Sequence, residues 1–544
     1  MNKKATKPFG GSRFCEKLFM TMTVFAASAV TAEFTPDRSV MNEAYWKIWT
    51  PEVQAKLDAD IEKYRKADAE VEIPAPEGTT VSVEQTSHGF FFGAHIFNFN
   101  QLGTKARNDR YKALYGKEGA LFNSATVAFY WRAFERFPGK PRFEAGPEDS
   151  EEFWNTCANP KEQPHWRRPP TDPVIDYLVS RGCRIHGHPL VWGNNTWMTP
   201  NWLWDELCPE AEKAALEKAT GVKIPRWDAT IPAGSPSRKV GREWEKAWGK
   251  IYAKMNGEQI AALVPTFIKA QNDCYERRIR QIGERYGAKV HSWDVVNESA
   301  TDFHRFGDKA VRGRPFDGSH YGPMPTDYAY KAFQWAGKYL PATAWLNLND
   351  YNMSDAFFLQ ANDLVAHGAR IDVVGSQMHL FNPKESAKIA RGEFSKEVHA
   401  KTHPASVAER FRRVSEAGRP IHLSEITITA PDNSPNGQMI QAIIMRNLYR
   451  AWFSVEKMNG ITWWNVVDDC GAPGEPSISG IFTRDMNPKA AYFAMDDLIN
   501  REWKTKTTVA AKDGKASFRG FRGKYRISWK DADGKSREKT VEVD

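Results

Sequence analysis

Eight short, mostly apolar segments recur between residues 91 and 467, and longer helix-forming stretches separate them. The segments cover residues 91–96, 122–129, 184–192, 290–298, 343–350, 371–379, 421–428 and 460–467, with helix-forming stretches such as 259–287 and 436–457 between them. A strand that is buried on both faces is apolar at nearly every position, and helices that follow each strand provide this burial. The pattern predicts an α/β protein with a (β/α)8 TIM barrel. A doubly wound open sheet would alternate in the same way, but no glycine-rich phosphate loop follows the first segment.

The two ends of the chain depart from this rhythm. Residues 42–66 predict a helix that ends before Pro74 and Pro76, and residues 79–86 alternate apolar and polar positions as a strand does. Residues 501–544 hold short alternating segments divided by two "DGK" sequences, which predicts β-hairpins. We therefore expect both ends to form one small β-rich accessory unit. The expected organisation is a signal peptide at 1–32, an N-terminal helix and β segment at 33–86, a barrel at 87–500 and a β-rich C-terminal unit at 501–544.

The first 32 residues have the pattern of an export signal. Five Lys and Arg residues lie among the first 17, residues 18–30 are mostly apolar, and Val30-Thr31-Ala32 offers a cleavage site. An uncleaved anchor is the alternative, but the apolar stretch is shorter than the roughly 20 residues that span a bilayer. We expect a secreted or periplasmic protein without membrane insertion.

The charge of the chain is concentrated in its last segment. The formal net charge is +8, and without residues 1–32 the chain holds 70 Lys and Arg against 66 Asp and Glu. A nearly neutral body gives no reason to expect a nucleic-acid partner. Residues 501–544 carry 13 basic residues against 7 acidic ones, which favours either a solvated charged surface or a patch that holds an acidic polymer. We expect a monomer, although the sequence does not determine the oligomeric state.

Cysteines and histidines give no metal pattern. Six cysteines show neither a CxxC pair nor zinc-finger spacing, which argues against a zinc site and a disulfide scaffold, although one or two bridges stay open. His186 and His188 form a His-x-His pair that places both rings on one face of a strand, but no third ligand lies nearby. No HExxH, nucleophile elbow or P-loop is present. We therefore expect no metal and no cofactor.

Two carboxylates lie at the ends of predicted barrel strands. Glu298 ends the fourth segment and Glu425 lies toward the end of the seventh. Barrel enzymes place their active sites at the C-terminal ends of the strands, and the fourth and seventh of eight strands lie on roughly opposite sides of the mouth. Two facing carboxylates about 5 Å apart are the machinery of retaining glycoside hydrolysis. The pair predicts a glycosidase site.

Polar and aromatic residues end several other predicted strands. Sugars offer hydroxyl groups and apolar faces, which amides, imidazoles and indole rings match. A lone histidine or tryptophan is more often a core residue, but a set of them at strand ends favours a carbohydrate site. The set comprises His188, Trp192, Asn349, Asp350, Gln377, His379, Trp463 and Trp464.

The motifs "HGHPLVW", "WDVVNE", "NDYN", "GSQMHL" and "GITWWNV" make the chain resemble glycoside hydrolase family 10, the endo-β-1,4-xylanases, from about residue 84 to 500. The resemblance implies that Glu298 is the acid/base and Glu425 the nucleophile of a β-1,4-glycan hydrolase that acts on xylan or a xylan-like polymer. It further implies that Asn297 binds a sugar hydroxyl beside the cleaved bond. Other sugar-binding residues that it implies are His188, Trp192, Gln377, His379 and Trp464.

Several positions depart from the pattern of that family. In "TVAFYWRAFE", Arg132 stands where the family has a sugar-binding Lys, and Gly193-Asn194-Asn195 follows Trp192 instead of a His. Thr427 replaces a carboxylate near the nucleophile, so His379 should be less basic. Cys470 and "GAPGEPS" stand where a second Trp is expected. These changes keep two alternatives open, namely a hydrolase of another β-glycan, which could be acidic, and a silent carbohydrate-binding barrel.

Overall fold

A computed structural model describes residues 34–544, apart from residues 117–118, 195–196, 229, 232–234, 306–322 and 326. The predicted signal peptide and Asn195 lie outside the described residues, so export remains a prediction. No helix in the described part has the length and apolar character needed to cross a bilayer. The cysteines of that part are unpaired, and they are Cys157, Cys183, Cys208, Cys274 and Cys470.

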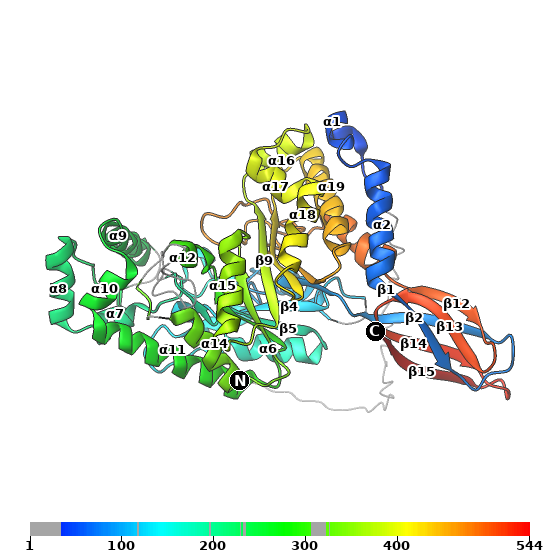
Figure 1. Cartoon of the computed structure of the whole chain (residues 1–544), viewed down its shortest axis with the longest axis horizontal. Coiled ribbons are helices and arrows are strands. Elements are labelled where there is room, and N and C mark those ends of the chain that lie inside the picture. Colours follow the sequence, from blue (N-terminus) through cyan, green and yellow to red (C-terminus); the bar gives the residue numbers. More distant parts are fainter. Residues whose placement is uncertain are drawn as a thin grey trace, which may run out of the picture.

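A closed parallel barrel forms the centre of the molecule (Figure 1). Its strands are β3 (Phe91–His95), β4 (Ser124–Ala128), β5 (Arg184–His188), β6 (Val191–Trp192), β7 (Ser292–Asn297), β8 (Trp345–Asp350), β9 (Val373–Leu380), β10 (Ile421–Ile428) and β11 (Met458–Trp463). The hydrogen-bonded order is β5-β4-β3-β11-β10-β9-β8-β7-β6, and pairing of β5 with β7 closes the ring. The predicted barrel is confirmed, and all eight predicted segments supply its strands.

The third barrel position is divided between two short strands, where the sequence pattern predicted one. β5 and β6 are separated at Pro189, whose nitrogen carries no hydrogen for the ladder. β5 pairs with the first residues of β7 and β6 with the last. Between them, the backbone N–H of Leu190 donates to the carbonyl of Asp294 at 2.8 Å. The proline therefore interrupts the strand without opening the barrel.

Helices cover the outside of the barrel and extend it. The predicted helix at 259–287 is divided at Val264, because Pro265 follows and disfavours helical backbone at the preceding residue. The predicted helix at 436–457 corresponds to α19, which begins after the Ser434 cap. The helices are α1 (Glu43–Trp46), α2 (Pro51–Arg65), α3 (Lys105–Ala113), α4 (Trp131–Phe134), α5 (Glu151–Thr156), α6 (Thr171–Ser180), α7 (Asn201–Leu207), α8 (Glu210–Thr220), α9 (Ser235–Tyr252), α10 (Gly257–Leu263), α11 (Pro265–Tyr286), α12 (Ala300–Arg305), α14 (Tyr328–Tyr339), α15 (Asp355–Ala366), α16 (Pro383–Ala390), α17 (Lys396–Thr402), α18 (Pro404–Ser415), α19 (Pro435–Phe453) and α20 (Ala490–Asp496), with short turns η1 (Arg38–Val40), η2 (Pro147–Asp149), η3 (Pro160–Glu162) and η4 (Asp497–Glu502).

Both ends of the chain form one antiparallel β unit, as predicted. A four-stranded sheet has the order β12-β2-β14-β15, and β1 pairs with β13. The two sheets enclose their own apolar cluster, which includes Val81, Val83, Phe518, Ile527 and Trp529. The strands are β1 (Lys66–Glu72), β2 (Thr80–His88), β12 (Lys506–Ala510), β13 (Lys515–Phe521), β14 (Gly523–Lys530) and β15 (Ser536–Val543).

The predicted helix at 42–66 is two helices, α1 and α2. α2 begins at Pro51 after Thr50, whose hydroxyl oxygen accepts a bond from the Val53 N–H at 3.3 Å. β1 follows α2 directly, and the sequence analysis assigned no strand there. Ala67, Ala69 and Val71 of β1 pack on the accessory core while the residues between them are charged. This period of two was too weakly apolar to stand out beside the helix-forming residues that precede it.

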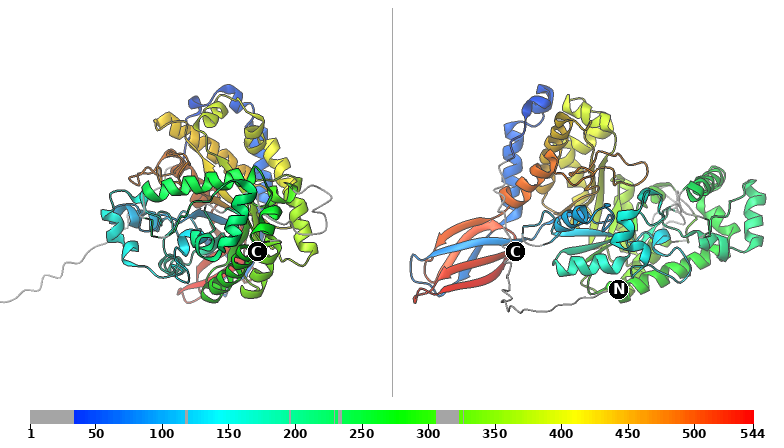
Figure 2. Two further views of the ribbon diagram at one scale, coloured as in Figure 1. Left: turned by 90° about the vertical axis from the view of Figure 1, so that its left-hand side faces the viewer. Right: turned by 180° about the vertical axis from the view of Figure 1, so that it is seen from behind.

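A helical arm, α7 to α10, projects from the barrel at the end opposite to the β unit (Figure 2). This insertion was not predicted from the sequence. Its interior is aromatic: the ring centroids of Trp204 and Trp248 lie 5.2 Å apart, and those of Trp244 and Trp248 lie 5.8 Å apart. The arm therefore has a packed core of its own that continues into the barrel helices through the contact of Trp204 with Phe267 of α11.

Gly187 of β5 provides the space that the Trp293 ring occupies. A Cβ atom at this position would lie 2.2 Å from two ring carbons of Trp293, which is fully buried. We expect Gly187→Ala to lower the free energy of unfolding by about 1–3 kcal/mol because it overpacks the core. Thermal unfolding followed by circular dichroism measures the effect. Gly337→Ala in α14 is the matched control, because a Cβ there meets no atom within 4 Å, and equal melting temperatures for all three proteins would contradict the prediction.

Candidate active site

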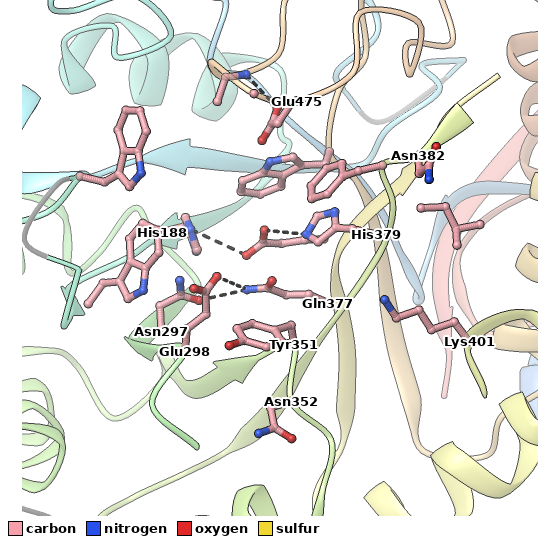
Figure 3. A pocket seen from close by; sticks show the side chains of 18 of the residues that line it. His188, Asn297, Glu298, Tyr351, Asn352, Gln377, His379, Asn382, Lys401 and Glu475 are labelled. Atoms are coloured by element: carbon pink, nitrogen blue, oxygen red, sulfur yellow. Dashed lines mark hydrogen bonds and ion pairs between the residues drawn. The ribbon is translucent and has the colours of Figure 1, made fainter. Parts of the chain in front are cut away.

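A cavity of about 1000 Å³ opens at the C-terminal ends of the barrel strands (Figure 3). Both predicted carboxylates, Glu298 and Glu425, line it. Six further predicted residues line the same cavity, and they are His188, Trp192, Asn297, Gln377, His379 and Trp464. Of the nine residues that the resemblance or the departures from it single out, eight line this cavity, and Arg132 is the exception. Asn349, Asp350 and Trp463, which also end predicted strands, do not line it.

Hydrogen bonds connect the two carboxylates through three amides. Gln377 Nε2 donates to Glu298 Oε1 at 3.1 Å and to Asn297 Oδ1 at 3.4 Å. Asn349 Nδ2 donates to the same Asn297 oxygen at 2.8 Å and to Glu425 Oε1 at 3.1 Å. Asn297, Gln377, Glu425 and Asn349 are all buried. Because the Asn297 oxygen accepts both bonds, its orientation is determined by its neighbours, and the network holds both carboxylates in one arrangement.

His188 is fixed between two carboxylates. Its Nδ1 lies 2.7 Å from Asp294 Oδ2, and its Nε2 lies 3.2 Å from Tyr130 Oη and 3.8 Å from Glu425 Oε1. Burial disfavours the charged ring, but the bond to Asp294 and the charge of Glu425 outweigh it, so the pKa of His188 is raised. His188 therefore supplies a donor or positive charge beside Glu425.

The His-x-His pair shares one buried carboxylate. His186 Nε2 lies 2.9 Å from the same Asp294 oxygen that His188 contacts. Burial alone would raise the pKa of Asp294, but the two rings outweigh it and hold the pKa below its ordinary value. Among the described residues, no group of three or more His, Cys, Asp and Glu is arranged to hold a metal ion.

His379 also contacts Glu425, and its ring lies across the cavity from His188 (Figure 3). Its Nε2 lies 3.4 Å from Glu425 Oε2, and its Nδ1 lies 3.0 Å from the hydroxyl of Thr427. The ring of Phe381 stacks on it, with centroids 4.5 Å apart. The Thr427 hydroxyl therefore takes the place of the carboxylate that the family pattern has near the nucleophile.

Glu298 lies at a strained point of the backbone. Its φ of 55° is in the left-handed region, which is uncommon for a residue with a side chain. Asp350 holds the turn that follows, because its oxygens accept the backbone N–H groups of Ala300 and Asn352, each at 2.8 Å. Burial, with the Glu298 charge as a smaller contribution, raises the pKa of Asp350 to about 8. Asp350 is therefore a buried acid that positions the loop of the catalytic candidate.

Sequence reasoning missed one polar cluster at the edge of the cavity. Glu475 Oε2 accepts bonds from Asn465 Nδ2 at 2.9 Å and from the Ala472 N–H at 2.8 Å, and it lies 3.7 Å from Arg167 Nη1. Burial opposes ionisation, but Arg167 and these bonds lower the pKa of Glu475 to about 2. Only the absence of an expected Trp marked this stretch in the sequence.

Three exposed aromatic residues also line the cavity. Trp197, Tyr351 and Phe381 are 40%, 45% and 40% exposed. Of the three, only Tyr351 carried a signal in the sequence, because it belongs to the "NDYN" motif. Their rings offer apolar faces to a sugar chain at the mouth of the cavity.

Arg132 lies outside this cavity. β4 ends at Ala128 and α4 begins at Trp131, so successive side chains turn by about 100° and Arg132 points toward the helical arm. Its guanidinium carbon lies 3.0 Å from the centroid of the Trp227 ring, and it lines a second cavity of about 460 Å³. The structure therefore does not bring Arg132 to the predicted sugar site; Tyr130, two residues earlier, lines the main cavity instead.

Comparison with known proteins finds similar sequences and structures. A model of glycosyl hydrolase family 10 matches residues 254–498, which contain Glu298 and Glu425. Endo-1,4-beta-xylanase C of Paenibacillus barcinonensis is 27% identical over 390 residues, which are 66% of this chain and 28% of that protein. Endo-1,4-beta-xylanase B of Thermotoga neapolitana is 23% identical over 62% of this chain and 75% of that protein. Among solved structures, xylanase B from Clostridium stercorarium F9 aligns with a TM-score of 0.46 and 18% identity over 75% of this chain and 96% of that one.

The matched region carries β7 to β11, the strands that supply both carboxylates and the amides between them. This chain spans little more than a quarter of the Paenibacillus protein, so what that whole protein does is not transferred to it. Residues 254–498 belong to glycosyl hydrolase family 10, and the chain is a distant relative of the endo-1,4-β-xylanases.

Proposed function

We propose that the protein is a retaining endo-glycosidase that hydrolyses a β-1,4-linked polysaccharide, xylan or a xylan-like glycan, by double displacement. The observation that carries this proposal is the chain of amides, Gln377, Asn297 and Asn349, that connects Glu298 to Glu425 inside one cavity. Two carboxylates held in a common network at a barrel mouth suit a reaction in which one attacks and the other transfers a proton.

Glu425 is the nucleophile in this proposal. His188, His379 and Asn349 all approach its two oxygens, so the carboxylate is oriented from three sides. It attacks the anomeric carbon and forms a glycosyl-enzyme ester, and the bond to the leaving oxygen breaks.

Glu298 is the acid/base. It gives its proton to the leaving oxygen and then takes a proton from the water that hydrolyses the ester. This role requires a Glu298 pKa raised toward neutrality.

The substrate assignment rests on two supports. Aromatic rings and amides line the cavity, which matches the faces and hydroxyl groups of sugars. The relatives reported above are named as endo-1,4-β-xylanases. The pattern of residues 1–32 supports export, so we propose that hydrolysis takes place in the periplasm or outside the cell.

The first test distinguishes the catalytic roles of Glu298 and Glu425. Hydrolysis of neutral and acidic polysaccharides is measured by reducing-end release, with proton NMR of the first anomer formed. We expect release of product with retained configuration, and we expect Glu425→Ala to lose about 10³-fold or more of the activity. With an aryl β-xylobioside and azide, Glu425→Ala should yield the α-azide by one displacement, and Glu298→Ala the β-azide by two.

Glu393→Ala is the control for this experiment, because Glu393 is exposed, pairs with Arg391 and does not line the cavity. The same azide anomer from both variants would refute the assigned roles. No release of reducing ends from any polymer, with polysaccharide binding that survives both substitutions, would show a carbohydrate-binding barrel instead of an enzyme.

The raised pKa of Asp350 predicts how the stability of the protein depends on pH. Its pKa of about 8 in the folded protein exceeds its ordinary value of 3.8, so between these values the folded state holds a proton that the unfolded chain has lost. Asp350 therefore lowers stability as the pH rises through this window. Melting temperatures are measured by calorimetry at intervals from about pH 4 to pH 8. As the pH rises, the melting temperature of the wild type should fall relative to that of Asp350→Asn, whose amide cannot ionise. Parallel curves for the two proteins would contradict the prediction.

A further inference from the structure

The second cavity adjoins the main one on the side of the helical arm. Its volume of about 460 Å³ is within the usual range of ligand pockets. α4, the segment before α6, α7 and α9 supply most of its lining. The two cavities share Arg167, Arg168, Trp197, Ala472 and Pro473. A glycan in the main cavity can therefore place a terminal unit or a substituent beside the second cavity.

Positive charge dominates the second cavity. Its lining contains three carboxylates, Glu162, Asp228 and Glu245. Two of them already face arginines, since Arg238 lies 3.0 Å from Glu162 and Arg226 lies 2.5 Å from Asp228. The cationic side chains of the lining are more numerous, and they are Arg132, Arg136, Lys161, Arg167, Arg168, Arg238 and Arg242.

Two of these arginines, Arg136 and Arg168, are partly buried and have no carboxylate partner among the described residues. Within the described residues, no carboxylate oxygen lies within 4 Å of the guanidinium nitrogens of Arg136 or Arg168. Arg168 donates from Nη1 to the Arg167 carbonyl at 2.9 Å, and its guanidinium carbon lies 3.7 Å from the Tyr130 centroid. Burial lowers the pKa of Arg168 only to about 10, so it stays charged at neutral pH. A charge that is withdrawn from water without a counter-ion is costly, and an anionic ligand would supply that counter-ion.

The remaining lining suits a sugar ring. Trp166, Trp202 and Trp227 contribute aromatic surface. The Trp166 side chain is only 8% exposed, and its Nε1 has no hydrogen-bond partner among the described residues. Asn201 Oδ1 is also buried without one in that part of the chain. A ligand with both hydroxyl groups and an anionic group would satisfy these atoms together with the arginines.

We propose that the second cavity is a subsite for the carboxylate of a uronic-acid unit carried by the glycan, with Arg136 and Arg168 as its anion-binding residues. Planar guanidinium groups bind carboxylates through paired hydrogen bonds, and arginine is therefore favoured at such sites. This inference rests on the proposed function for the nature of the polymer, but it concerns binding and not turnover.

The test measures binding to a protein that cannot hydrolyse the probe. Isothermal titration calorimetry on Glu425→Ala compares xylotriose bearing one glucuronic acid with the same compound after reduction of its carboxyl group to an alcohol. We expect the acidic probe to bind at least about tenfold more tightly, which corresponds to a difference of about 1.4 kcal/mol in the free energy of binding. We expect this preference to weaken as salt is added.

Arg136→Gln, combined with Glu425→Ala, is the variant, since Arg136 lines only the second cavity. It should abolish most of the preference while affinity for the reduced probe stays unchanged. Arg412→Gln is the matched control, because Arg412 is exposed, pairs with Glu409 and Glu416 and lines neither cavity.

Three results with the acidic and reduced probes would overturn the proposal. These are equal binding of the two probes, no binding of either, and equal loss of affinity for both in Arg136→Gln. Tighter binding of a sulfated xylotriose than of the uronic probe would overturn the assignment to a carboxylate. Failure of the proposed function is distinguishable, because it would appear as absent turnover of neutral polymer in the wild type while the preference for the acidic probe persisted.

Discussion

The closed hydrogen-bond ladder of the barrel is the constraint on which the rest of the structure depends. Strands buried on both faces have no water to satisfy their backbone groups, so every strand needs two neighbours. Pairing of β5 with β7 completes the ring although Pro189 interrupts the third position. Closure brings the ends of β7 and β10 to one mouth. There Ser424 donates to Asn349 Oδ1 at 2.5 Å, which turns the Asn349 amide so that its Nδ2 faces Glu425.

The two appendages are stabilised in different ways. The basic C-terminal segment pairs with acids from the other end of the chain, as in Lys515 with Glu70 at 2.9 Å and Arg526 with Glu84 at 2.7 Å. Such exposed pairs contribute about 0–1 kcal/mol each, so the shared apolar cluster of the β unit contributes more to its stability. Arg65 connects this unit to the barrel, because its Nε and Nη1 donate to the carbonyls of Phe453 and Met458 at 2.6 and 2.8 Å. The surplus charge of the tail is thus partly balanced within the molecule.

The candidate site could be predicted where it lies on strands and could not where it lies on loops. Glu298 and Glu425 were found because strand periodicity places them at strand ends and barrels use those ends. Arg132 was misplaced because the turn from β4 into α4 directs its side chain toward Trp227, and no periodic pattern encodes that direction. Arg167 and Glu475 come from irregular segments 308 residues apart in sequence, so only their proximity in space marks them.

By itself, the sequence determined the barrel, the accessory β unit and the strand-end residues of the main cavity. It did so because burial on two faces, alternation on one face and turn residues leave local patterns that do not depend on distant contacts. The tertiary structure alone decided the amide network between the carboxylates, the division of the third strand between two partners of β7, and the arginine-rich second cavity. Each of these depends on side chains from segments far apart in the chain, whose distances and orientations are set only when the barrel closes.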